Sequence, residues 1–266
     1  GKCYEGNESE QEKINEFDEY YESENAVFWY TRNCFLFRLL NRAFRTEDID
    51  NIFRFRFFVV DLYQQLPNLY SSQHFPTKLT VYRGQSIGLT ELQHLKENID
   101  QLISMNTFLS TTTDKEVASI FAGDGANLPS YERSVLFEMT IDTTHCYKSK
   151  PLADVSKRSH MKDENEILLS MGTISQISSI DIENNVWFVK LILTGQEDKR
   201  LIQLIDYQKM LLREKETVVL LGIFLQDMGE VEKAKRYYNL VLKDLPVDSV
   251  DVSSVYNNLG AIAKDE

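Results

Sequence analysis

The chain has 266 residues, 42% of them hydrophobic, which is enough for one large domain or for a medium domain with an appendage. Its net charge of −12 argues against nucleic-acid binding, because phosphate backbones are held by Lys and Arg. The sequence has no apolar run of the roughly 18 residues that a membrane span needs, and its polar first residues do not resemble a signal peptide. We therefore expect a cytoplasmic protein, although an upstream signal could have been removed from a chain that begins at Gly1.

The acidic excess is concentrated at the start, where residues 1–25 hold nine Asp and Glu against two Lys. This composition predicts a solvated, partly ordered acidic lead-in over residues 1–20. From residue 10 to about residue 70 the pattern is helical. Apolar positions recur at helical spacing over Ala26–Phe44, and Thr46-Glu47-Asp48 marks the start of a helix over Ile49–Leu66.

After Pro76 the pattern changes to short strands. The predicted strands are Lys78–Arg83, Thr107–Thr111, Ser134–Ile141, Glu166–Leu169 and Val186–Leu193. A capping box at Thr113-Asp114-Lys115-Glu116 predicts a short helix that ends near Phe121. Short strands separated by loops favour an α+β domain with an antiparallel or mixed sheet over a doubly wound fold.

The charged residues that follow Gly195 mark a domain boundary. We expect a linking helix over 196–214 and an all-α repeat segment over 215–266. The second segment has Leu221, Gly222, Ala234, Tyr238 and Pro246 at the spacing of a tetratricopeptide repeat, and Leu259-Gly260 begins a second copy. Because a single repeat cannot bury its own face, we predict that the natural chain continues with further repeats, which would bind a protein partner.

Three short elements carry groups suited to chemistry. Arg83 ends the first strand, Ser110 lies on the second, and Glu164 and Glu166 begin the strand near 166. Residues i and i+2 of a strand face the same side, so the two carboxylates are predicted to project together. Like charges side by side disfavour folding, and the pair is either functional or a solvated strand end.

As a set these elements resemble the Arg–Ser–Glu-x-Glu signature of the arginine-specific mono-ADP-ribosyltransferases. The resemblance rests on Val81-Tyr82-Arg83-Gly84, on Phe108-Leu109-Ser110-Thr111-Thr112 with Ala118 and Phe121, and on the segment from Ser159 to Leu169. It covers about residues 20–194 and implies a catalytic domain over 21–195. The implied fold is a helical N-terminal part packed on a mixed or antiparallel β-sandwich core. Two departures stand out: Thr112 replaces a Ser, and His160-Met161 stand where an aromatic pair is frequent, which leaves the choice of acceptor open.

The resemblance implies transfer of ADP-ribose from NAD⁺, as co-substrate, to arginine on a protein, without a metal. It assigns catalysis to Arg83, Ser110, Glu164 and Glu166. It assigns NAD⁺ binding to Arg83, Gly84, Ser110, Thr111, Phe121 and Glu166. In this assignment Arg83 holds the phosphates, Glu166 contacts the ribose 2′-hydroxyl, and Glu164 orients or deprotonates the acceptor guanidinium. Phe121 either packs near the nicotinamide or is plain core.

Two alternatives remain open at this point. An NAD⁺ glycohydrolase with the same fold would use water as the acceptor. A non-catalytic module would use the helical repeats to recruit partners. The four His and three Cys do not have the spacing of a metal site or of a catalytic Cys–His pair.

Overall fold

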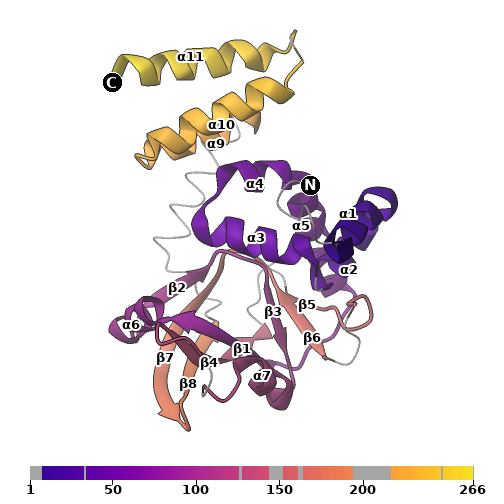
Figure 1. Cartoon of the computed structure of the whole chain (residues 1–266), viewed down its shortest axis with the longest axis vertical. Helices are drawn as coiled ribbons and strands as arrows, with labels where there is room; N and C mark the ends of the chain where they lie inside the picture. Colours follow the sequence, from indigo (N-terminus) through magenta and orange to yellow (C-terminus); the bar gives the residue numbers. More distant parts are fainter. Residues whose placement is uncertain are drawn as a thin grey trace. The chain divides into compact units, whose positions relative to one another are not determined.

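The computed structural model describes residues 8–32, 34–125, 128–143, 152–160, 164–193, 217–246 and 248–265. They form two compact units. The first unit holds the residues up to Asn41 and those from Phe57 through the sheet, and the second holds Arg42–Arg56 with the C-terminal helices (Figure 1). The expected linking helix over 196–214 lies outside the described residues.

Six helical segments precede the sheet. They are α1 (Glu8–Tyr20), η2 (Ser23–Asn25), α2 (Ala26–Thr31), α3 (Phe35–Thr46), α4 (Ile49–Arg54) and α5 (Arg56–Ser71). The two long helices expected from the sequence are each divided, the first after Thr31 and the second at Phe55. Asp48 caps α4 by accepting a hydrogen bond from the Asn51 N–H, because the first amides of a helix lack partners within it.

The described part of the acidic start forms α1, which contacts other helices of the first unit. The Phe17 ring on α1 packs edge-on against Trp29, with 5.1 Å between ring centroids. Glu10 is buried and forms ion pairs with Lys13 at 3.0 Å and with Arg38 at 2.7 Å. Apolar contacts and paired charges therefore hold α1 within the first unit, although most of its side chains are exposed or half-buried, and the acidic lead-in over residues 1–20 stays a prediction.

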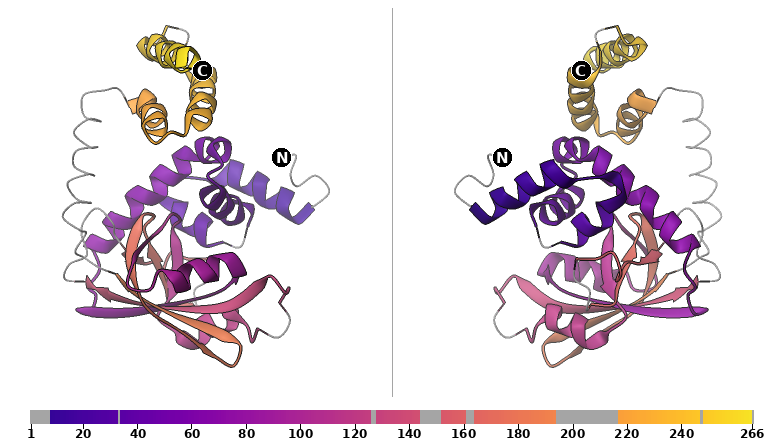
Figure 2. Two further views of the ribbon diagram at one scale, coloured as in Figure 1. Left: turned by 90° about the vertical axis from the view of Figure 1, so that its left-hand side faces the viewer. Right: turned by 90° about the vertical axis from the view of Figure 1, so that its right-hand side faces the viewer.

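The strands form one mixed sheet. They are β1 (Lys78–Gly88), β2 (Leu102–Met105), β3 (Leu109–Thr112), β4 (Glu132–Asp142), β5 (Leu152–Asp154), β6 (Glu166–Leu169), β7 (Thr173–Glu183) and β8 (Val186–Leu193). Their order is β2-β7-β8-β4-β1-β3-β6-β5, and all neighbours are antiparallel except β4 and β8. Both views in Figure 2 place α1, α2 and α5 along one side of this sheet. The antiparallel or mixed sheet predicted from the sequence is confirmed.

The sheet is narrow at one point, between β1 and β3. β1 pairs with β4 along its whole length from Lys78 to Gly88. It pairs with β3 only at Tyr82 and Thr112. A single residue pair thus joins two groups of strands into one sheet, and the β-sandwich that the resemblance implies stays a prediction. The main core is shared by the strands on both sides of this pair and includes Val81, Met139 and Ile177 together with Leu109 and Ile167.

Among the described residues between the strands lie two helices, α6 (Leu89–Glu97) and α7 (Lys115–Ala122). The N-cap of α7 is Asp114, whose side chain accepts from the backbone N–H groups of Glu116 and Val117. The predicted capping box headed by Thr113 is therefore wrong by one residue, and the helix itself is present.

The second unit contains α9 (Thr217–Asp227), α10 (Val231–Asp244) and α11 (Val250–Asp265). Gly222 allows α9 to lie against the buried Tyr238 ring of α10, since a Cβ there would be 2.2 Å from Tyr238 Cε1. Within the same unit α4 packs on α10, where the Phe53 and Tyr237 rings meet at 5.9 Å and Asp50 pairs with Arg236. That these helices are tetratricopeptide repeats stays a prediction.

Among the described helices, none combines the length and apolar character needed to cross a bilayer.

Candidate active site

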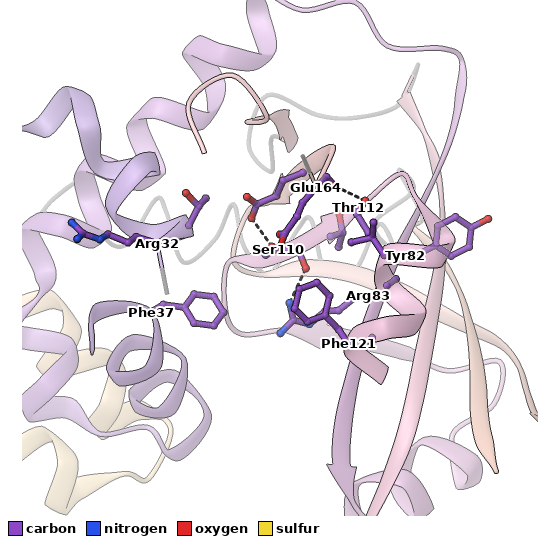
Figure 3. A pocket seen from close by; sticks show the side chains of 14 residues that line it. Arg32, Phe37, Tyr82, Arg83, Ser110, Thr112, Phe121 and Glu164 are labelled. Carbon is purple, nitrogen blue, oxygen red and sulfur yellow. Dashed lines mark hydrogen bonds between the residues drawn. The ribbon is translucent and has the colours of Figure 1, made fainter. Parts of the chain in front are cut away.

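All the site residues expected from the sequence line one pocket of about 330 Å³ (Figure 3). They are Arg83, Gly84, Ser110, Thr111, Phe121, Glu164 and Glu166. They come from β1, β3, α7, the start of β6 and the turn before it, and the pocket lies beside the paired residues Tyr82 and Thr112. In Figure 3 the Phe37 ring faces this group from the helical side, and the Tyr82 ring points away from it.

Glu166 is the most enclosed acidic group of the pocket, with 3% of its surface exposed. Ser110 Oγ donates to Glu166 Oε1 at 2.5 Å, and Ser159 Oγ donates to Oε2 at 2.7 Å. Burial raises the pKa of Glu166, with a smaller upward contribution from Glu164, whereas the two serines and Arg83 act in the opposite direction. The result is a raised pKa for a carboxylate that both serines hold in one orientation.

Glu164 reaches the same pocket by a route that the sequence did not predict. Strand β6 begins only at Glu166, and Asn165 has a φ of 45°, in the left-handed region that Asn tolerates better than most residues. The alternation argument is therefore wrong for Glu164. Thr112 Oγ1 fixes this turn by donating to the Glu164 carbonyl at 2.5 Å. Burial raises the pKa of the Glu164 carboxyl.

Arg83 extends from β1 toward β3. Its Nε donates to Gln85 Oε1 at 2.9 Å, and one terminal nitrogen donates to the Ser110 carbonyl at 2.7 Å. The guanidinium thus links β1 to β3 through the Ser110 carbonyl. Its positive charge opposes the rise in the pKa of Glu166. A planar group with five N–H donors suits phosphate recognition, which is the role expected for it from the sequence.

The other predicted residues differ in what they contact. Gly84 packs against α7, because a Cβ at this position would be 1.8 Å from the Ala118 carbonyl oxygen. Thr111 is buried, and its hydroxyl donates to the Ile167 carbonyl at 2.7 Å, so its side chain serves the β3–β6 pairing. Phe121 is 59% exposed at the rim of the pocket, so the plain-core alternative for Phe121 is wrong.

The helical side of the pocket was not assigned from the sequence. Thr31, Arg32 and Phe37 line it. Arg32 pairs with Glu16 at 2.8 Å, and its guanidinium carbon lies 5.2 Å from the centre of the Trp29 ring. Single residues on amphipathic helices give no periodic signal that separates pocket lining from core packing, so only their place in the fold reveals them.

The arrangement can stabilise positive charge. A carboxylate that is removed from water and fixed by two hydroxyls is already oriented before a cation forms beside it. A second carboxylate in the same pocket can accept a proton. Within the part of the chain that the structure describes, no group of three His, Cys, Asp or Glu is arranged to hold a metal ion.

Solved structures show which fold this is. Vis, an ADP-ribosyltransferase from Vibrio splendidus solved in complex with agmatine, aligns at 18% identity with a TM-score of 0.51, covering 74% of this chain and 88% of Vis. HopU1, an ADP-ribosyltransferase of Pseudomonas syringae pv. tomato DC3000, aligns at 20% identity with a TM-score of 0.51, covering 71% and 84%. No family model and no curated protein matches the sequence. The chain therefore has the ADP-ribosyltransferase fold.

Proposed function

We propose that the protein is a mono-ADP-ribosyltransferase that transfers ADP-ribose from NAD⁺ to arginine on a protein and releases nicotinamide. The observation that carries this proposal is the buried Glu166 carboxylate, held by Ser110 and Ser159 in a pocket that also contains Arg83 and Glu164. A structural role alone does not account for two acidic groups in one partly apolar pocket, because desolvated like charges disfavour folding.

Glu166 acts on the sugar. The bond between ribose C1′ and the nicotinamide nitrogen breaks with its electron pair leaving on nicotinamide, and positive charge develops on the ribose. The Glu166 carboxylate lies against the ribose 2′-hydroxyl and stabilises this charge more in the transition state than in the bound substrate. Removal of one such preorganised contact costs on the order of 100- to 1000-fold in rate.

Glu164 acts on the acceptor. An arginine guanidinium is a poor nucleophile because its pKa exceeds about 12. As the new bond forms between C1′ and a guanidinium nitrogen, Glu164 accepts the proton that this nitrogen loses. Agmatine, the molecule bound to Vis, carries the same guanidinium group as arginine, which favours this acceptor over other side chains.

Arg83 and Phe121 position the dinucleotide. The Arg83 guanidinium binds its phosphates, and the exposed Phe121 ring packs near the nicotinamide at the pocket rim. Gly84 and Thr111 contribute their backbone to the same pocket. α7 lies where a Gly84 side chain would be, and the Thr111 hydroxyl is bonded to the Ile167 carbonyl. The C-terminal helices recruit a protein partner, and the protein acts in the cytoplasm.

The test is incubation of the full chain with NAD⁺ and agmatine, followed by separation of nicotinamide, free ADP-ribose and ADP-ribosyl-agmatine. Wild type is expected to give the agmatine adduct. Glu166→Gln is expected to lose all turnover, and Glu164→Gln to lose the adduct but keep NAD⁺ hydrolysis. Glu183→Gln, a change at an exposed residue of β7, is the matched control and keeps full activity.

Each alternative has its own outcome. Free ADP-ribose as the sole product, with agmatine and with protein acceptors, identifies a glycohydrolase. NAD⁺ binding that calorimetry cannot detect identifies a non-catalytic module. Equal turnover by Glu166→Gln and wild type refutes the assignment of Glu166.

A further inference from the structure

A short turn after β5, Val155–Ser159, lies directly against Glu166. The Val155 N–H donates to the Glu166 carbonyl at 2.9 Å. The chain then folds back, with the Ser159 N–H donating to the Val155 carbonyl at 2.6 Å. At the end of the turn Ser159 Oγ donates to Glu166 Oε2 at 2.7 Å. One turn of five residues thus holds both the backbone and the carboxylate of Glu166.

The same turn is anchored to the helical part of the first unit. The His160 N–H donates to Thr31 Oγ1 on α2 at 3.0 Å. The His160 ring meets the Phe28 ring edge-on, with 5.5 Å between centroids. Ser159 itself is only 2% exposed. Its hydroxyl is therefore held in a fixed place rather than at the tip of a mobile loop.

We propose that Ser159 is a positioning residue that fixes the plane of the Glu166 carboxylate for the transfer reaction. The terminal torsion of a glutamate is broad, so a hydrogen bond to one oxygen leaves the carboxylate plane free to turn. Ser110 on β3 donates to Oε1, and Ser159 at the end of the Val155–Ser159 turn donates to Oε2. Two donors on two oxygens remove that freedom. This inference rests on the function proposed above.

The proposal adds a residue that lies outside the Arg–Ser–Glu-x-Glu pattern. Ser159 precedes Glu166 by seven residues, and the turn that begins at Val155 brings it back to the carboxylate. Because it touches the acid rather than the substrate, its loss is expected to lower kcat and to leave the KM for NAD⁺ nearly unchanged.

The experiment compares Ser159→Ala and Ser159→Cys with wild type in the full chain. Small misplacement of a reacting group costs up to about 100-fold, and we expect kcat to fall about 10- to 100-fold in Ser159→Ala. Cys has nearly the size of Ser but is a weak donor, so Ser159→Cys should show a similar loss. Ser170→Ala is the matched control, since Ser170 is equally buried and its Oγ has no hydrogen-bond partner among the described residues.

The pH profile separates positioning from packing. The Ser159 hydrogen bond lowers the pKa of Glu166, so its loss raises that pKa further, and the acid limb of kcat moves to higher pH. A kcat within twofold of wild type with an unmoved acid limb in both variants overturns the proposal. Recovery of full activity by Ser159→Cys assigns the effect to packing and also overturns it.

Failure of the proposed function gives a different result. If wild type does not consume NAD⁺, or if Glu166→Gln is as active as wild type, the transferase assignment is wrong. The contact between Ser159 and Glu166 is then tested without an activity measurement. Carbon-13 NMR of labelled glutamate then follows the Glu166 carboxyl in wild type and in Ser159→Ala. A higher pKa in the variant supports the hydrogen bond as the positioning contact, and an unchanged pKa refutes it.

Discussion

Gly84 and Ala118 lie so close that a Cβ on Gly84 would be 1.8 Å from the Ala118 carbonyl oxygen. The same atom would be 2.4 Å from the Ala122 backbone nitrogen. Because both atoms belong to the backbone of α7, neither can move without displacing the helix that carries Phe121. The glycine therefore sets the distance between β1 and α7 at one wall of the pocket.

Gly84→Ala is accordingly expected to destabilise the protein. Overpacking costs about 1–3 kcal/mol in well-packed cores, and contact with backbone atoms places this case at the upper end or beyond. Chemical denaturation measures the change in the free energy of unfolding. Gly88→Ala is the control on the same strand, since a Cβ there meets nothing within 4 Å. Equal stability of the two variants would contradict the packing role of Gly84.

The second prediction concerns stability and pH at Glu166. Its pKa is raised in the folded state, so the folded carboxyl binds its proton more readily than the unfolded one. The associated stability is fully present below the ordinary glutamate pKa and is lost as pH rises through the raised pKa. Glutamine does not titrate, and Glu166→Gln should therefore gain thermal stability relative to wild type as pH rises from acid to neutral.

Melting temperatures between about pH 4 and pH 8 measure this difference for Glu166→Gln, with Glu183→Gln as the exposed control. The control should follow wild type across the range. A difference between Glu166→Gln and wild type that shrinks as pH rises would mean that the serines and Arg83 outweigh the effect of burial.

The third prediction uses the coupling between the two carboxylates. The charge on Glu164 raises the pKa of Glu166, so its removal in Glu164→Gln lowers that pKa. Hydrolysis of NAD⁺ that needs ionised Glu166 should therefore keep its activity to lower pH in Glu164→Gln than in wild type. Release of nicotinamide without an acceptor, followed across pH, gives both acid limbs. A shift to higher pH, as expected for Ser159→Ala, would be inconsistent with this coupling.

Alternation of apolar residues predicted part of the sheet well. β6 and β8 begin and end where the sequence placed them, and their buried side chains are apolar except for Glu166 at the start of β6. β7 was missed although it has 11 residues. Its buried positions include Thr173 and Ser175, so the inward face is partly polar, and a register shift between Ile177 and Ser179 interrupts the alternation further. Burial of polar side chains depends on partners that the local sequence does not show.

The site shows the same limit. The resemblance singled out Arg83, Ser110, Glu164 and Glu166, and the fold brings all four to one pocket. Their roles remain proposals. The reason given for pairing the two glutamates was wrong, because a left-handed Asn165 rather than strand alternation turns Glu164 toward the pocket. Backbone conformation at a single residue is not visible in periodicity.

The last prediction concerns two glycines of the C-terminal helices. A Cβ on Gly222 would be 2.2 Å from Cε1 and 2.3 Å from Cζ of Tyr238. Tyr238 is fully buried, and its hydroxyl donates to Gln226 Oε1 at 2.8 Å, so its ring cannot turn aside without losing this bond. Gly222→Ala should therefore loosen the contact between α9 and α10.

Gly260→Ala should have the opposite effect. Gly260 lies in α11, where a Cβ meets nothing within 4 Å. Alanine is favoured over glycine within helices by about 0.5–1 kcal/mol, so this variant should be more stable than wild type. Amide hydrogen exchange in the full chain reports both: faster exchange over 217–246 for Gly222→Ala, slower exchange over α11 for Gly260→Ala, and unchanged exchange in the sheet. Because the two substitutions are chemically identical, opposite signs can only come from the surroundings of each glycine, and equal signs would contradict the close packing of α9 on Tyr238.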